Sequence, residues 1–178
     1  MMGNLSRGRC VWVLAVCLLL ALVSQARAGK VAIVEVDINS YQVHQALSRL
    51  ELPDSVQTRF FTLEDLNADP GARTFIADSS VVFVNVMMPE LADFMVKEQL
   101  LSGRAVYALN HAGDPDDLRR KGFLFDEGIM GYYEHMTVNN MIHMVRMAVH
   151  RHIDSAVTFK PVERLPAACI HHPDAPEN

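Results

Sequence analysis

A short uncharged run, Val81–Val86, is the most regular feature in the hydrophobic pattern of this chain. Its apolar residues do not alternate strictly with polar ones, which is typical of a strand buried on both faces. Beyond this run, Pro89 lies where the first turn of a helix tolerates proline, and apolar residues recur at about helical spacing as far as Leu101. The stretch therefore predicts a central parallel strand, a loop and a helix, and with them an α/β fold.

The same alternation of strands and helices extends over most of the chain. Further strands are predicted at residues 30–37, 56–61 and 104–109, and helices at residues 40–50, 63–66, 71–77, 114–120, 128–135 and 137–153. Ser40 is the expected N-cap of the first of these helices. Repeated strand–helix–strand units imply a parallel sheet with right-handed connections. We expect a flavodoxin-like sheet of four or five strands, in the order 2-1-3-4, with helices on both faces.

Polar side chains follow three of these strands, and we expect them at one edge of the sheet. Asp37 ends the first strand, Asn85 lies at the end of the third, and His111 follows the fourth. In an open α/β sheet, ligands bind at the carboxyl ends of the strands, so these three are candidate ligand-binding residues. The alternative is that they cap helices and close turns. No glycine-rich phosphate loop stands at a strand–helix junction, which argues against a nucleotide or flavin.

The amino terminus has the pattern of a secretory signal peptide. Arg7 and Arg9 precede an uncharged run, Val11–Val23, and the small residues Ala26 and Ala28 follow. The run is shorter than the roughly 20 residues that a membrane-spanning helix needs. We therefore expect residues 1–28 to be a signal peptide, with export to the periplasm and membrane contact only through an uncleaved signal segment.

Removal of the signal peptide makes the charge balance more acidic. Residues 29–178 contain 13 basic and 21 acidic side chains, a net charge of −8 compared with −5 for the whole sequence. This balance, together with the lack of a basic cluster other than residues 119–121, argues against nucleic acid as a partner. Cys169 is the only cysteine of the three that remains, so an intramolecular disulfide is excluded in the mature chain.

Histidine and methionine side chains give the last helix a possible metal-binding side. His143, Met147 and His150 fall on one side of the helix, and such soft and imidazole ligands suit copper, zinc or a haem iron. However, the two histidines are about 10 Å apart along the helix axis. The alternative is a set of core methionines with partly exposed histidines. The adjacent His171 and His172 are further weak metal candidates.

The tail differs in composition from the rest of the chain. We expect an α/β domain at residues 29–156 and a proline-rich linker at residues 157–178, which ends in His172-Pro173-Asp174-Ala175-Pro176-Glu177-Asn178. A linker of this kind usually leads to another domain, which suggests that the chain is a truncated form of something longer.

Several segments together carry a resemblance to a known family. They are the central strand up to Lys97, Tyr107-Ala108-Leu109, Gly122-Phe123, Tyr132-Tyr133, Val145-Arg146, Asp154-Ser155 and the His172–Pro176 string. The chain resembles the amino-terminal part of the CobN-type large subunit of cobaltochelatase, which is related to the H subunit of magnesium chelatase.

The resemblance implies a function in a metal–tetrapyrrole chelatase system. In this family the large subunit binds a tetrapyrrole and a divalent metal, and partner ATPase subunits drive insertion with ATP. Most of that machinery lies beyond the part that this chain resembles, so we expect no catalysis by the chain on its own, and we expect the rest of a CobN-like subunit or other chelatase subunits as partners. Because the chain is expected to be exported, haem or corrinoid metal handling in the periplasm is the implied role. The alternative is a periplasmic α/β module that binds a metal or a tetrapyrrole without reaction.

Overall fold

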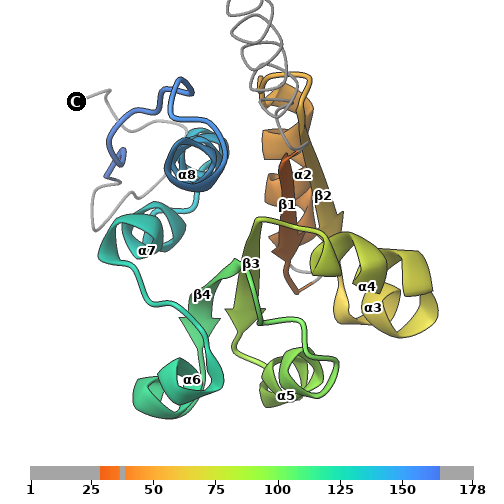
Figure 1. Cartoon of the computed structure of the whole chain (residues 1–178). Coiled ribbons are helices and arrows are strands. Elements are labelled where there is room, and N and C mark those ends of the chain that lie inside the picture. The colour runs from red at the N-terminus through yellow and green to blue at the C-terminus, as the bar shows by residue number, and fades with distance from the viewer. Residues whose placement is uncertain (1–28, 37–38, 165–178) are drawn as a thin grey trace, which may run out of the picture.

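Four parallel strands form the single sheet of the described part of the chain (Figure 1). The computed structural model describes residues 29–36 and 39–164. The strands are β1 (Gly29–Val34), β2 (Val56–Phe61), β3 (Val81–Val86) and β4 (Ala105–His111), and they lie in the order β2-β1-β3-β4. The predicted order and the parallel pairing are confirmed, and β3 lies inside the sheet between β1 and β4.

Seven helices of the described residues cover the two faces of this sheet. They are α2 (Ser40–Arg49), α3 (Leu63–Ala68), α4 (Pro70–Ala77), α5 (Pro89–Lys97), α6 (Pro115–Lys121), α7 (Glu127–Glu134) and α8 (Val138–His152). Figure 1 shows α7 and α8 on one side of the sheet and α5 and α6 on the other. Within residues 29–36 and 39–164, no helix is both long enough and apolar enough to cross a membrane.

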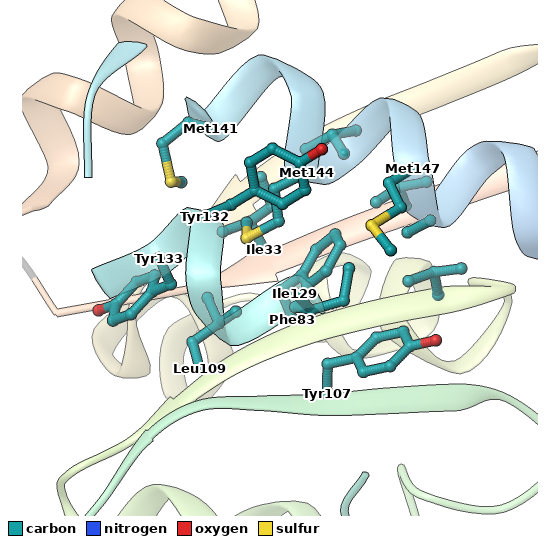
Figure 2. Packing of buried hydrophobic residues seen from close by; sticks show 14 of the residues in the cluster. Ile33, Phe83, Tyr107, Leu109, Ile129, Tyr132, Tyr133, Met141, Met144 and Met147 are labelled. Atoms are coloured by element: carbon teal, nitrogen blue, oxygen red, sulfur yellow. The ribbon is translucent and has the colours of Figure 1, made fainter. Parts of the chain in front are cut away.

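β3 is uncharged and is buried on both faces, each of which packs in a separate hydrophobic cluster. In β3, Val81 and Phe83 pack in one cluster with α2, α7 and α8, while Val82 and Val84 pack in the other with α3 to α6. All four side chains are fully buried. Figure 2 shows Phe83 among the aromatic and methionine side chains of the first cluster. Burial on both faces explains why the apolar run of β3 does not alternate.

Several predicted boundaries differ from the structure. The strand predicted at residues 30–37 ends at Val34, and the helix predicted at residues 63–66 continues to Ala68. The end of α5 differs most. The helix was expected to continue to Leu101 but ends at Lys97. Gln99 adopts a left-handed conformation with φ 56°, and its N–H donates to the Val96 carbonyl while the Leu100 N–H donates to the Met95 carbonyl. These two hydrogen bonds form a Schellman motif, which ends a helix. A hydrophobic contact between the residue after the left-handed position and a residue of the last helical turn often accompanies this motif.

Another boundary that differs is the end of β4, which was expected at Leu109 and instead lies at His111. Ala108 pairs with Val84, but Asn85 pairs with Asn110, so one residue of β4 is left over as a bulge. The predicted N-cap of the first helix is also corrected, because Asn39 occupies that position and Ser40 is the first helical residue.

Candidate functional site

A buried polar network lies at the carboxyl ends of β1 and β3. Glu35 directly follows β1 and is 1% exposed, and Asn85 in β3 is 2% exposed. The Tyr133 hydroxyl, from α7, donates to Glu35 Oε2 at 2.9 Å. Asn85 Nδ2 donates to Glu35 Oε1 and to the Tyr133 hydroxyl. The two central strands and α7 thus share one carboxyl group.

Further donors complete the surroundings of the Glu35 carboxyl group. Asn39 Nδ2 donates to Glu35 Oε1 at 3.1 Å, and the Val36 N–H donates to the same oxygen at 3.0 Å. Burial, and then the charge of Glu35, raise the pKa of Tyr133 well above its ordinary value. The hydroxyl therefore keeps its proton and remains a donor. A buried carboxylate is tolerated when it is hydrogen-bonded in this way.

A small crevice opens beside this network, at the point where the strand order reverses. Its volume is about 120 Å³, and its lining includes Glu35, Thr62, Leu63, Met88 and Leu91. Pockets that bury a drug-sized ligand have volumes of about 300–1,000 Å³. The crevice is where an α/β sheet of this order binds its ligands, but its volume suits only a group of a few atoms.

The residues predicted to bind a ligand at this edge have different surroundings. Asn85 belongs to the network, whereas Asp37 lies outside the described residues. His111 is in the last position of β4, where its ring packs edge-on against Phe125 at 5.3 Å between centroids, and its buried Nδ1 has no hydrogen-bond partner among the described residues. Ligand binding by these three residues stays a prediction.

Sequence reasoning missed Glu35 and Tyr133 as members of the site. Glu35 lies within the first predicted strand and Tyr133 within the helix predicted at residues 128–135, and neither was a candidate site residue. A signal for Glu35 was present, because a single carboxylate between Val34 and Val36 interrupts an apolar run. A charge at such a position needs partners if the run is buried.

The predicted metal-binding side of α8 faces the chain that follows it. The His150 Nδ1 lies 2.9 Å from the Val157 carbonyl oxygen, and the Lys160 N–H donates to His143 Nδ1 at 3.4 Å. Met147 is 8% exposed and points into the cluster of Figure 2. Among the described residues, no group of three or more histidine, cysteine, aspartate or glutamate side chains could hold a metal ion. His171 and His172 lie outside the described residues, and metal binding by all four histidines stays a prediction.

Residues 157–164, which the sequence assigns to a linker, run back along α8, and we call them the C-terminal strap. Asn140 is 1% exposed; its Nδ2 donates to the Glu163 carbonyl at 2.8 Å and its Oδ1 accepts from the Glu163 N–H at 2.9 Å. The Tyr132 hydroxyl donates to the Lys160 carbonyl, and Val157 is buried in the same cluster as α8. The strap is therefore packed as part of the domain.

Comparison with known proteins relates the fold to one solved structure. No family model matches the sequence, and no curated protein matches it significantly. The structure is similar to the catalytic subunit of cobaltochelatase from Mycobacterium tuberculosis, with a TM-score of 0.54 and 14% sequence identity. The similarity covers 84% of this chain and 13% of that subunit. At this identity, the likeness shows a shared fold.

Proposed function

We propose that this chain is an exported CobN-like domain of a metal–tetrapyrrole chelatase system, and that it acts in assembly rather than in metal insertion. The observation that carries the proposal is the fold shared with a cobaltochelatase catalytic subunit over 84% of this chain. The sequence also resembles the amino-terminal part of CobN-type subunits, and this resemblance supports the proposal without reference to the fold.

The geometry of the network favours a role other than catalysis. Metal insertion needs a site that holds the macrocycle, positions the ion and accepts two pyrrole protons. The Glu35 carboxyl group, which could accept a proton, already accepts hydrogen bonds from Tyr133, Asn85, Asn39 and Val36. The adjoining crevice, at about 120 Å³, is smaller than the pockets that hold even drug-sized ligands.

The rest of a CobN-like subunit is the partner that we propose. The chain spans 13% of the length of the solved cobaltochelatase subunit, so a domain of this size in such a subunit would contact other parts of it. Met87 and Met88 directly follow β3 and are 50% and 38% exposed. Met88 lines the crevice, and we call the two methionines its rim. Methionine adapts to irregular apolar partners, so we assign the contact to this rim.

Reconstitution of cobalt insertion tests the proposal. The CobN-like polypeptide from the same genome, without its first α/β domain, would be mixed with its ATPase partners, a corrin substrate, Co²⁺ and ATP, with and without this chain. We expect insertion to increase when the chain is added, and to be absent when the chain is supplied without that polypeptide. Replacement of both Met87 and Met88 by glutamine should reduce the gain, whereas Val96→Gln, on α5 and 40% exposed, should preserve it.

Three results would count against the proposal. They are metal insertion by the purified chain without partners, no gain on addition of the chain, and equal losses in the rim and control variants. Tight binding of haemin or Zn²⁺ by the chain, with no gain in insertion, would instead support the periplasmic binding module.

Export is tested separately from the chelatase role. Mass spectrometry of the protein from its own cells should find Gly29 as the amino-terminal residue, in the periplasmic fraction. An intact Met1 in the cytosolic fraction would contradict export and would leave the reconstitution experiment unaffected.

A further inference from the structure

A second, larger pocket lies away from the crevice, between the end of α2, one side of α8 and the C-terminal strap. Its volume is about 310 Å³, which is at the lower end of the range of small-molecule sites. Basic side chains line it from all three elements: Arg49 from α2, His143 and Arg146 from α8, and Lys160 from the strap. Glu51 is the single acidic residue of the lining.

The three permanent cations of this pocket lack carboxylate partners. Within the described residues, Arg49, Arg146 and Lys160 form no ion pair. The basic residues of α6 differ, since Arg119 lies 2.6 Å from Asp116 and the other two also face aspartates. In a chain with a net charge of −5, three cations without such partners around one pocket are a local reversal of charge.

Arg146 is held in a fixed orientation at this pocket. Its Nε donates to the Thr158 carbonyl at 2.5 Å and its Nη1 donates to the Glu51 carbonyl at 2.6 Å. A guanidinium group has five N–H donors, so three remain for a ligand. Because two carbonyl groups already orient the planar group, little side-chain entropy is lost when a further oxygen binds.

Two of the same charges act on His143, which also lines the pocket. Burial lowers the pKa of His143, and the charges of Lys160 and Arg146 lower it further. An anion that neutralises these charges would be attracted by the same field.

We propose that this pocket binds small molecules through a doubly charged oxyanion, either a phosphate group or a pair of carboxylates. Arg146 offers a planar fork that suits either group, and Arg49 and Lys160 approach from the two other elements of the pocket. Ile142 and Phe159 complete the lining and offer apolar contact to the body of the ligand. The site is separate from the crevice, and the proposal does not rest on the chelatase relation.

Calorimetric titration of the protein purified from its own cells tests this inference. The probes are inorganic phosphate and succinate, each at constant ionic strength so that general screening does not change. We expect saturable binding of at least one probe. Either Lys160→Gln or Arg49→Gln should weaken the affinity about two- to fivefold, which is the size of effect that an ion pair exposed to solvent contributes. Arg146 is left unchanged because it also holds the strap. Lys97→Gln is the matched control, because Lys97 is exposed on α5 and its substitution also removes one positive charge.

The possible outcomes distinguish phosphate compounds from dicarboxylates as ligands, and they also include results that overturn the proposal. Stronger binding of phosphate assigns the pocket to phosphate compounds, and stronger binding of succinate assigns it to dicarboxylates. Absence of saturable binding for both probes overturns the proposal, as does an equal loss of affinity in Lys97→Gln. Amide chemical shifts of the unsubstituted protein give a measurement that needs no variant: on addition of the tighter probe they should change at residues 49–51 and 158–160, and changes confined to other residues overturn the proposal.

Discussion

Removal of the Tyr133 hydroxyl is the most direct test of the buried network. Tyr133→Phe keeps the ring, which packs in the cluster of Figure 2, and deletes one oxygen. That oxygen donates to Glu35 Oε2 at 2.9 Å and accepts from Asn85 Nδ2 at 2.9 Å and from Asn39 Nδ2 at 3.3 Å. The substitution therefore changes hydrogen bonding with little change in packing.

The expected loss follows from the charge of the acceptor. A hydrogen bond to a charged group contributes about 1.5–3 kcal/mol to stability. Glu35 keeps its other donors, from Asn85, Asn39 and Val36, so the loss should lie within that range and not above it. We expect the free energy of unfolding to fall by about 2 kcal/mol, which is a roughly 30-fold change in the folded-to-unfolded ratio.

Urea unfolding followed by circular dichroism measures this difference, and an unchanged slope with urea concentration would show that both proteins unfold in the same way. Tyr41→Phe is the matched control: Tyr41 is 69% exposed, and its hydroxyl accepts from Gln45 at 2.7 Å. The control should change stability by no more than about 0.5 kcal/mol. A double-mutant cycle with Glu35→Gln should give an interaction energy above about 0.5 kcal/mol. Equal effects of Tyr133→Phe and Tyr41→Phe would refute the stabilising role of the hydroxyl.

Three further predictions concern α5, α8 and the strap. Gln99→Gly should stabilise the protein by about 1 kcal/mol in urea unfolding, because glycine adopts the left-handed conformation at φ 56° without strain; a loss of stability would contradict this. Since the pKa of His143 is lowered by burial and by nearby positive charges, the folded state favours the neutral ring, and stability should fall as the pH drops below about 6.5. His143→Gln should make that fall smaller, and an unchanged pH dependence would show that the ring contributes nothing. Asn140→Ala leaves the Glu163 backbone groups without their side-chain partners and should cost about 1–3 kcal/mol. It should also speed hydrogen exchange of the Glu163 amide, and exchange at the original rate would mean that Asn140 does not hold the strap.

Most of the elements could be predicted from local patterns. Val81–Val86 and Val56–Phe61 are strands with the boundaries that their β-branched and aromatic residues indicate. Proline in the first turn and aspartate before it predict α6, in which Asp114 caps the helix by accepting from the Asp116 N–H. These signals act within a few residues, so the sequence displays them directly.

The ends of α5 and β4 depended on partners distant in the sequence. β4 continues through Asn110 and His111 because β3 continues beside it to Val86, and polar residues in that position resemble a loop when they are read in isolation. α5 stops at Lys97 although its apolar spacing continues, because Leu100 is buried in the cluster beneath it. In both cases the neighbouring surface decided where the element ends.

The sequence by itself determined the fold class and the strand order of this protein, since hydrophobic periodicity and short connections leave few ways to bury the strands. It could not show which polar groups meet. Glu35 and Tyr133 are 98 positions apart, and only the docking of α7 over the ends of β1 and β3 brings the hydroxyl to the carboxylate. The same holds for Arg146 and Glu51, 95 positions apart, which are joined across the basic pocket. Burial then determines the chemistry of Glu35, because a carboxylate removed from water must find its partners within the tertiary structure.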